Sequence, residues 1–599
     1  MQKIINEFSI LVSTVNGSGS ATANNALMKA IFKKGIPISA RNIFPSNIQG
    51  LPTWYSLRVS EKGHLARVDE FDILINLDKA VLLDDIKKVK KGGLILCDQP
   101  IPDSISSQFQ VLQLPIQEVL EKTEAPTNLH VYLMNMVYVG ILSALIDIDL
   151  PLIEETLNQH FNNVSKAVKP NMDVVQVAHD MVAQEFIHTC PYKLEKRKVT
   201  ENYIVTDGNQ AAALGALFGG LQFSAWYPIT PATELAEGLN EYNPQLRNDP
   251  ETGKATCVIV QAEDELAAIG MTIGAGWAGL RSMTSTSGPG LCLMAEYIGL
   301  AYQSEVPVVI WDVQRVGPST GMPTRTSQGD LTFSYFMSHG DTDYVILLPG
   351  SVQECFEFGW RALDIAEQIQ SPVIVLSDLD LGMNNWMTPK FEYPEIPIQR
   401  GKILWEEDIE KILKKTNGKW GRYSDVDGDG ITYRTLPGNT NPKAAYFARG
   451  TGHDEFANYT EEPDIWKNEH DRIKRKFIKA LEIDPNPVLE RDNQGTIGFI
   501  SYGSSHFGTE EACDILKADG KRVDYLRVRS LPFQNEVKNF IQKHERIYVI
   551  EANRDGQMAQ ILMLNFPAYA GRIRKIACLD GLSLTAKWII GCFTDQEKE

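Results

Sequence analysis

The sequence predicts a multidomain α/β protein. The chain has 599 residues, of which 43% are hydrophobic and 22% charged, so it can bury large cores and should divide into about three or four domains. Short β-branched runs alternate with longer helical stretches in three separate regions, a pattern typical of parallel sheets covered by helices. A further stretch shows little sustained periodicity and is expected to be irregular.

The first predicted domain spans residues 1–190. Its strands are expected at Phe8–Val12, Phe71–Ile75 and Gly93–Leu96. The apolar stretch from Val131 to Ile146 is shorter than the roughly 18 residues that suggest a membrane span, and Asn135, Gly140 and Ser143 interrupt it. We therefore expect a buried helix there.

The second predicted domain spans residues 200–390 and follows a charged linker at 193–198. Its strands are expected at Cys257–Val260, Pro307–Trp311 and Pro372–Leu376. Residues 391–490 are rich in Pro, Gly, Asp and Lys, which predicts an irregular connection or insertion. Residues 491–599 form a third, smaller α/β domain, with strands expected at Thr496–Ile500 and Ile547–Ile550.

Charge and cysteine usage exclude several classes of function. The formal net charge of −18 argues against nucleic acid as a partner, because phosphate binding needs clustered Lys and Arg. The eight cysteines are scattered singly without a Cys-x-x-Cys pair, which rules out a local iron–sulfur or zinc motif and makes a disulfide framework improbable. With no signal peptide apparent, we expect a cytoplasmic protein that has no membrane partner.

Glu265 is the candidate catalytic residue. It follows the predicted strand Cys257–Val260 at the expected start of a helix rich in Gly and Ala. Small residues let a backbone approach a ring closely, and the helix dipole favours a carboxylate at this position. An isolated Glu here could simply initiate the helix. Together with Tyr227–Pro231, however, it resembles one half of a thiamine diphosphate site, where a carboxylate protonates the aminopyrimidine ring.

Four motifs carry a wider resemblance: Tyr227–Pro231, Glu265 with its Gly/Ala helix, Thr284–Gly290 and Gly317–Thr324. They resemble the α subunit of 2-oxoacid:ferredoxin oxidoreductases, in the form that carries the γ domain fused at the N-terminus. The resemblance covers nearly the whole chain. It implies a doubly wound, pyrimidine-type thiamine diphosphate-binding domain at 200–390, a γ domain at 1–190 and a transketolase C-terminal-like domain at 491–599, to which we assign assembly.

The resemblance assigns roles to the residues of the Tyr227–Pro231 motif and of the Glu265 helix. Glu265 would bind the thiamine ring, with Glu263 as the second choice, and Pro228 and Ile229 would also contact the cofactor. Thr230 would lie by the carboxylate and keto group of the substrate. The alternative is that the two prolines of this motif merely form a rigid turn.

The resemblance also implies further substrate-binding residues. Arg315 matches the arginine that binds the substrate carboxylate, which a planar guanidinium holds through two parallel hydrogen bonds. Without the adjoining Gly-Pro-Ser-Thr-Gly motif, an arginine at a strand end would be read as a surface cation. Thr324 matches a threonine of the same pocket. Ser46 is a further candidate, because Phe44–Gly50 resembles a γ-domain loop that reaches the substrate.

An acidic loop in the irregular region permits two metal interpretations. Gly428–Gly430 with Asn458 has the spacing of a thiamine diphosphate–magnesium motif, but neither a buried strand before it nor a helix after it is expected, so we reject this reading. A calcium loop would begin with the same alternating acids, which are Asp425, Asp427 and Asp429. Position twelve is Leu436 rather than Glu. An acidic surface turn is therefore the favoured interpretation, and a cation site is the alternative.

The resemblance implies a reaction that this chain cannot complete alone. A β subunit would contribute the diphosphate-binding domain, Mg²⁺ and a 4Fe–4S cluster, in an (αβ)₂ assembly with ferredoxin docking on β. The substrate favoured is 2-oxoglutarate, converted with coenzyme A to succinyl-CoA, for two reasons: the γ domain is fused, and the loop Gly450–Glu455 around His453 is similar to one in 2-oxoglutarate-type members. A lone His is otherwise usually structural. Pyruvate or a broad 2-oxoacid range is the alternative. A non-catalytic assembly subunit is the competing class, but retention of Glu265, Thr230 and Arg315 argues against it.

Overall fold

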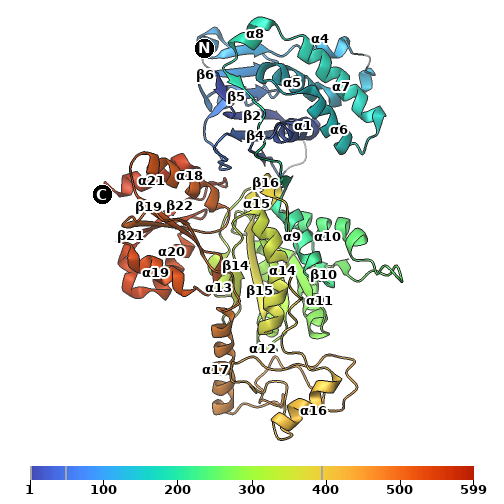
Figure 1. Cartoon of the computed structure of the whole chain (residues 1–599), viewed down its shortest axis with the longest axis vertical. Helices are drawn as coiled ribbons and strands as arrows, with labels where there is room; N and C mark the ends of the chain where they lie inside the picture. The colour runs from blue at the N-terminus through green and yellow to red at the C-terminus, as the bar shows by residue number, and fades with distance from the viewer. Residues whose placement is uncertain (1–2, 47–49, 124, 393–394, 599) are drawn as a thin grey trace. The chain divides into compact units, whose positions relative to one another are not determined.

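The computed structural model describes residues 3–46, 50–123, 125–392 and 395–598. The chain divides into two compact units, whose parts are coloured along the sequence in Figure 1. Unit 1 comprises Met1–Thr206, Asn384–Lys390 and Leu584–Gly591. Unit 2 comprises Asp207–Met383, Phe391–Ser583 and Cys592–Glu599.

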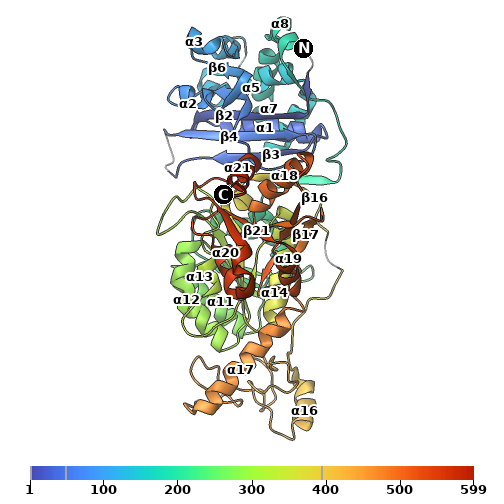
Figure 2. The ribbon, with the colours of Figure 1, turned by 90° about the vertical axis from the view of Figure 1, so that its left-hand side faces the viewer.

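An eight-stranded sheet forms the centre of unit 1, and Figure 2 shows its strands β2, β4 and β3 side by side. The strand order is β7-β6-β5-β2-β4-β3-β16-β9. Strands β2, β5, β6 and β7 are parallel, whereas β4, β3, β16 and β9 pair antiparallel. The bounds are β2 (Glu7–Val15), β3 (Ile38–Ile43), β4 (Pro52–Ser60), β5 (Phe71–Asn76), β6 (Val89–Cys97), β7 (Gln110–Gln113), β9 (Tyr203–Thr206) and β16 (Asn385–Pro389). The three strands predicted for this region are confirmed as parts of β2, β5 and β6. A separate two-stranded sheet pairs β1 (Ile4–Ile5) with β8 (Tyr192–Lys193).

Helices cover both faces of this sheet because apolar side chains alternate along its central strands. On β2, Ile10 and Val12 face the larger core and Leu11 faces the smaller one. Five helices contribute to the larger core: α1 (Ser20–Lys33), α4 (Ile116–Glu121), α5 (His130–Ile146), α6 (Leu150–His160) and α7 (Ser165–Asp180). The other helices are α2 (Leu82–Ile86), α3 (Asp103–Ser106), η1 (Thr127–Leu129) and α8 (Gln184–Thr189).

Helix α5 is the buried apolar helix that the sequence predicts. In the described part of the chain, Thr127–Ile146 is the one helical segment long and apolar enough to cross a membrane, and most of it is buried inside the protein. A Cβ atom on Gly140 would lie 2.3 Å from the carbonyl oxygen of Val175 on α7. Glycine therefore permits the close packing of α5 and α7.

Strands β9 and β16, which were not expected from the sequence, complete the sheet of unit 1. Their residues fall just inside the two ends of the expected range 200–390. Trp386 on β16 pairs with Thr206 and Ser39, and the guanidinium of Arg41 lies 4.4 Å from the centroid of its buried ring. This pairing joins distant segments through backbone hydrogen bonds, which leave no local pattern in the sequence.

Unit 2 contains a seven-stranded sheet with the order β11-β10-β12-β13-β15-β14-β20. All neighbours are parallel except β14 and β20. The strands are β10 (Phe223–Trp226), β11 (Val258–Gln261), β12 (Ser282–Thr286), β13 (Val308–Gln314), β14 (Val345–Leu347), β15 (Pro372–Asp378) and β20 (Ser530–Leu531). The helices are α9 (Gly208–Phe218), α10 (Thr233–Leu246), α11 (Glu265–Trp277), α12 (Gly288–Gln303), α13 (Leu331–Tyr335), α14 (Val352–Ile369) and α15 (Leu379–Met383). The strands predicted in this region are confirmed as β11, β13 and β15, although Cys257 and Pro307 precede the first residues of β11 and β13.

A second sheet of unit 2, coloured red in Figure 1, is built from the C-terminal region. Its order is β17-β19-β18-β21-β22, and only the β17–β19 pair is antiparallel. The strands are β17 (Val488–Arg491), β18 (Ile497–Ser501), β19 (Val523–Arg527), β21 (Arg546–Glu551) and β22 (Ile573–Ala577). The helices are α18 (Ser505–Ala518), α19 (Asn535–Lys543), α20 (Gln557–Asn565), η2 (Pro567–Arg572) and α21 (Ala586–Gln596). The multidomain α/β fold class is confirmed.

The region 391–490 is less irregular than the sequence suggests, because it contains α16 (Glu406–Lys415) and the 18-residue helix α17 (Pro463–Ala480). The buried side of α17 includes two cations, Arg472 and Lys476, which lie 2.6 and 2.9 Å from the buried carboxylate of Glu305. Burial alone would raise the pKa of Glu305, but these cations hold it below its ordinary value. A helix that buries charges lacks the apolar periodicity on which sequence prediction depends.

Candidate functional site

Four predicted motifs meet at one edge of the seven-stranded sheet. Tyr227–Pro231 follows β10, Glu265 follows β11, Thr284–Gly290 spans the end of β12, and Arg315 follows β13. The strands β11, β10, β12 and β13 are neighbours in that order and run parallel. In open parallel sheets, ligands bind beyond the carboxyl ends of the strands. The fold therefore gathers Thr230, Glu265 and Arg315 where a ligand is expected.

Glu265 is the first residue of α11. The helix begins there because the Asp264 carboxylate accepts a hydrogen bond of 2.6 Å from the backbone N–H of Ala267. The Glu265 side chain is half-buried and packs towards α12, whereas Glu263 is exposed. This packing favours Glu265 over Glu263 as the carboxylate of the site.

Gly290, in the first turn of α12, leaves room for Glu265. A Cβ atom at residue 290 would lie 2.1 Å from Oγ1 of Thr286 and 2.9 Å from Cγ of Glu265. Such distances are well inside van der Waals contact, so any larger residue would displace the Glu265 side chain or the end of β12. The glycine of this motif thus fixes the position of the carboxylate.

We expect Gly290→Ala to displace Glu265. Overpacking of this kind costs about 1–3 kcal/mol, and a misplaced catalytic group lowers kcat on the order of ten- to a hundredfold. The measurement is turnover of the chain co-expressed with its partner, together with thermal unfolding. Gly274→Ala on α11 is the matched control, because nothing lies within 4 Å of the added Cβ atom. Full turnover in Gly290→Ala would contradict the assignment.

Arg315 contacts the Tyr227–Pro231 motif directly. Its Nη1 donates a hydrogen bond of 2.7 Å to the carbonyl oxygen of Thr230. The residue is only 8% exposed, and its Nε has no hydrogen-bond partner. Burial lowers the pKa of Arg315, against the opposing charge of Asp330, but the group stays cationic at neutral pH. A buried guanidinium with an unused donor fits an anionic ligand.

The remaining predicted residues are Pro228, Ile229, Thr324 and Ser46. Ile229 is half-buried and Pro228 exposed. The Ile229 carbonyl accepts hydrogen bonds from the N–H groups of Ala232 and Thr233, so the motif is also the turn that the alternative interpretation expects. Thr324 is half-buried in the loop that follows Arg315. Ser46 is exposed in unit 1, and residues 47–49 of its loop lie outside the described residues.

Sequence reasoning missed Gln328, which ties the loop after Arg315 to the C-terminal domain. Its Nε2 donates to the carbonyl oxygen of Tyr502 at 2.8 Å, and its Oε1 accepts from Ser505 Oγ at 2.7 Å and from the Ala552 N–H at 2.8 Å. The C-terminal domain therefore holds this loop in place, besides any role in assembly. No local motif marks a glutamine whose partners lie more than 170 residues away.

Sequence reasoning also missed a carboxyl pair beside Arg315. Asp312 on β13 is fully buried, and Asp330 lies at the end of the loop that follows Arg315. Burial raises the pKa of Asp312 well above its ordinary value and raises that of Asp330 to about 6. Perturbed acids of this kind are characteristic of functional sites. Only tertiary proximity shows that the two residues belong together.

The cation interpretation of the acidic loop is not supported. Asp427 pairs with Lys402 and Lys415 at 2.8 and 2.6 Å, and Asp429 also pairs with Lys402. Asp425 pairs with Arg475 at 3.0 Å. Within the described ranges, no three His, Cys, Asp or Glu side chains form a group that could hold a metal ion. The carboxylates are neutralised by protein cations, as an acidic surface turn would be.

The rejected magnesium motif and the His453 loop both lie in the insertion. Residues 421–427, directly before Gly428, form turns and bends. His453 is buried, its ring lies tilted with its centroid 4.0 Å from that of Tyr423, and its Nδ1 bonds to the Thr451 carbonyl at 2.8 Å. Burial lowers its pKa, so the imidazole is neutral at pH 7. These contacts agree with a structural role.

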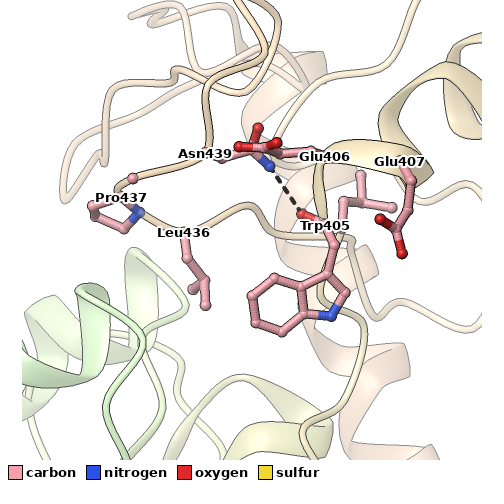
Figure 3. A pocket seen from close by; sticks show the side chains of 8 residues that line it. Trp405, Glu406, Glu407, Leu436, Pro437 and Asn439 are labelled. Carbon is pink, nitrogen blue, oxygen red and sulfur yellow. Dashed lines mark hydrogen bonds between the residues drawn. The ribbon is translucent and has the colours of Figure 1, made fainter.

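A cavity of about 570 Å³ lies in the insertion, away from the sheet edge. Figure 3 shows its lining, Leu404–Glu407 and Leu436–Asn439, with a hydrogen bond of 3.3 Å from Nδ2 of Asn439 to the carbonyl oxygen of Leu404. None of the residues predicted to bind substrate or cofactor contributes to it. It is therefore not part of the candidate site.

The sheet edge fits a cofactor that needs a carboxylate and close backbone approach. Glu265 is half-buried and therefore reachable. The hydroxyl groups of Thr284, Ser285 and Ser287, at and just after the end of β12, are buried without hydrogen-bond partners. Buried polar groups normally find a partner, so these hydroxyl groups are available to a ligand. Thiamine diphosphate is a group of this kind.

Comparison with known proteins gives a consistent result. Residues 214–408 match the family described as pyruvate flavodoxin/ferredoxin oxidoreductase, thiamine diphosphate-binding, and residues 9–181 match pyruvate ferredoxin/flavodoxin oxidoreductase. The chain is 30% identical to 2-oxoacid:ferredoxin oxidoreductase 1, subunit alpha, of Sulfurisphaera tokodaii, over 92% of each chain. It is 36% identical to the 2-oxoglutarate synthase subunit KorA of Methanothermobacter marburgensis, over 60% of this chain and 90% of that one.

One solved structure matches almost the whole chain. It is the 2-oxoglutarate:ferredoxin oxidoreductase from Magnetococcus marinus with 2-oxoglutarate, coenzyme A and succinyl-CoA bound. The TM-score is 0.87 and the sequence identity 27%, with 99% of each chain covered. The similarity thus extends over both units.

Proposed function

Since the chain belongs to the 2-oxoacid:ferredoxin oxidoreductase family, in which it corresponds to subunit alpha, we propose that it acts in the oxidative decarboxylation of 2-oxoglutarate. The products would be succinyl-CoA, CO₂ and reduced ferredoxin. The observation that carries this proposal is the convergence of Glu265, Thr230 and Arg315 at one sheet edge. The choice of 2-oxoglutarate is supported by the 2-oxoglutarate synthase subunits, at 34–37% identity, and by the similar solved structure.

Glu265 has the central role in the proposed chemistry. When bound, thiamine diphosphate would supply a nucleophilic carbon for the keto group and a sink for the electron pair that the departing CO₂ leaves behind. The Glu265 carboxylate would hold a proton at the aminopyrimidine ring, with Pro228 and Ile229 contacting the same cofactor. The packing of Glu265 against Gly290 keeps this carboxylate in one orientation.

Arg315 and its neighbours would bind the substrate. The guanidinium of Arg315 would hold the 2-oxoacid carboxylate, and Thr230 and Thr324 would line the same pocket. Because Thr230 O already accepts from Nη1 of Arg315, the arginine is oriented before substrate arrives, which reduces the entropy lost on binding. Ser46 is the proposed contribution of the γ domain.

We propose a β subunit as the partner that completes the site. It would carry the diphosphate-binding domain, Mg²⁺ and a 4Fe–4S cluster, and ferredoxin would dock on it, in an (αβ)₂ assembly located in the cytoplasm. The residues at the sheet edge supply a carboxylate and an anion-binding guanidinium, which support binding of the pyrimidine ring and the substrate. Neither residue is suited to binding a diphosphate with its metal.

The proposed domain division follows the sequence motifs: a γ domain at 1–190, the pyrimidine-binding domain at 200–390, an insertion at 391–490 and the transketolase C-terminal-like domain at 491–599. We propose assembly as one role of the last domain. Its hydrogen bonds to Gln328 support a second role, which is to hold the loop between Arg315 and Asp330 in place.

A broad 2-oxoacid range is the second candidate function. The relatives that cover 92–93% of this chain are named 2-oxoacid:ferredoxin oxidoreductases, without a single substrate. Pyruvate would then also be a substrate. The two candidate functions differ in whether the pocket binds the second carboxylate of 2-oxoglutarate specifically.

The test is co-expression of this chain with the β-type partner, followed by CoA-dependent reduction of a viologen dye. We expect 2-oxoglutarate to give a higher kcat/KM than pyruvate or 2-oxobutyrate. Similar values for all three would support the broad-range alternative. An assembled complex that reduced the dye with none of them would contradict the proposed function.

A further inference from the structure

Two carboxyl groups beside Arg315 lack the hydrogen-bond donors that buried carboxylates need. Both side-chain oxygens of Asp312 and Oδ2 of Asp330 are enclosed without a donor. Burial of an unpaired carboxylate is costly, so such groups retain protons.

The two carboxyl groups act on each other. A hydrogen bond between them requires a proton on one of them, because an ionised carboxylate only accepts. Burial raises the pKa of Asp312, and the charge of Asp330 and the bond to it raise this pKa further. The same bond lowers the pKa of Asp330 against the effect of burial. The pair therefore holds at least one proton between its two carboxyl groups.

Asp330 ends the loop that begins after Arg315, and this loop end contacts α12. Its backbone N–H donates to Oε1 of Gln314 at 3.1 Å, next to Arg315. A Cβ atom on Gly288 would lie 2.8 Å from both carboxylate oxygens of Asp330, so this side chain packs against the first turn of α12. Glu265 packs against Gly290 in the same turn. The pair thus lies beside both the proposed substrate cation and the turn that positions Glu265.

The charged and titratable groups around the pair come from several elements. Arg315, after β13, lowers the pKa of Asp330 through its charge. Burial raises the pKa of Cys292 on α12 and of Tyr502 after β18, and the charge of Asp330 adds to both effects. Both groups are neutral at pH 7. Arg315 is therefore the cation whose charge Asp330 balances.

Other acids lie around the same residues. Glu265 begins α11, and Glu551 on β21 and Asp378 at the end of β15 act on Tyr502 together with Asp330. Burial raises the pKa of Asp378 to about 6.

We propose that Asp312 and Asp330 share one proton before substrate binds and take up a second proton when the 2-oxoacid carboxylate binds Arg315. The inference rests on the proposed role of Arg315. The second proton comes from solvent, so that both carboxyl groups then carry an O–H bond, and Arg315 stays cationic. Asp330 is thus a positioning residue. Its negative charge balances Arg315 in the free site, and it becomes neutral when the substrate anion takes over that balance.

The proposal determines how affinity depends on pH. The second negative charge near Arg315 raises the pKa of Asp330 in the complex above its value in the free site. Between these two pKa values, proton uptake accompanies binding, so the dissociation constant of the 2-oxoacid rises by up to tenfold per pH unit. Below the lower pKa value, Asp330 is already protonated and the affinity no longer changes with pH.

The experiment uses the assembled holoenzyme and N-oxalylglycine, a 2-oxoglutarate analogue whose amide is not decarboxylated. Calorimetric titration at pH 7, in buffers of different ionisation enthalpy, measures the protons taken up. We expect uptake of a fraction of one proton by the wild type and none by Asp330→Asn. Asp312→Asn is the matched control, because its amide still donates to Asp330 and uptake should persist.

Two outcomes would overturn the proposal: no proton uptake by the wild type, or equal uptake by the wild type and Asp330→Asn. The wild-type measurement decides alone if Asp330→Asn fails to assemble. Arg315→Ala separates this question from the proposed function. Unchanged affinity of Arg315→Ala for the analogue would contradict the role of Arg315. If Arg315→Ala binds the analogue more weakly but Asp330→Asn takes up as many protons as the wild type, only the proposal about the carboxyl pair is contradicted.

Discussion

Replacement of Glu265 by Gln is expected to reduce kcat by about 10²–10⁴-fold, the usual contribution of a positioned acid–base group. Gln keeps the size of the side chain and its packing against Gly290, but it cannot hold a proton at the aminopyrimidine ring. Because Thr230 and Arg315 are untouched, KM for the 2-oxoacid should change little. The measurements are CoA-dependent viologen reduction and the rate of deuterium exchange at the thiazolium carbon of the bound cofactor.

Glu263→Gln is the control for this prediction, since Glu263 is exposed two residues before α11 begins. It removes the same charge and should retain turnover and exchange rate. Circular dichroism and the unfolding temperature check that Glu265→Gln folds and assembles. A Glu265→Gln enzyme with kcat within tenfold of the wild type would show that another group activates the cofactor.

The second large effect is expected for Arg315. Removal of the guanidinium by Arg315→Ala deletes charge-assisted hydrogen bonds worth about 1.5–3 kcal/mol each, so kcat/KM for the 2-oxoacid should fall by about 10²–10³-fold. Arg315→Lys keeps the charge but loses the planar pair of donors, and it should retain part of the activity. Steady-state kinetics with 2-oxoglutarate and pyruvate measure both variants.

Arg554→Ala is the control, because Arg554 is an exposed arginine that pairs with its neighbour Asp555. It should leave kcat/KM unchanged. Loss of affinity for coenzyme A rather than for the 2-oxoacid in Arg315→Ala would contradict the assignment. A drop in kcat with unchanged KM would instead point to a role in orienting Thr230, whose carbonyl oxygen Arg315 contacts.

The sequence predicted those features of the site that depend on local order. Glu265 was expected at the start of a helix after a strand, and α11 begins there after β11. Arg315 was expected after a strand, and it follows β13. In a parallel sheet, residues that follow adjacent strands meet at one edge, so correct local predictions were enough to bring these residues together once the strand order was known.

Other features depended on interactions between distant segments. The strand β16, which contains Trp386, has no local sequence signal because its pairing with β9 and β3 is non-local. Helix α17 has none because it buries Arg472 and Lys476 against Glu305. The sequence favours an acidic surface turn over a cation site at Asp427, but the two lysines that neutralise this carboxylate are apparent only in the structure.

The sequence by itself determined the α/β fold class, the main strands, the family and the identity of Glu265, Thr230 and Arg315 as the candidate residues, because each is encoded in a short segment with its own periodicity or motif. Only the tertiary structure decided which residues support them. Gly290 accommodates Glu265, Gln328 anchors the substrate loop, and Asp312 and Asp330 share a buried environment beside Arg315. These relations arise from packing and desolvation, which depend on what surrounds a residue in space rather than on its neighbours in the chain.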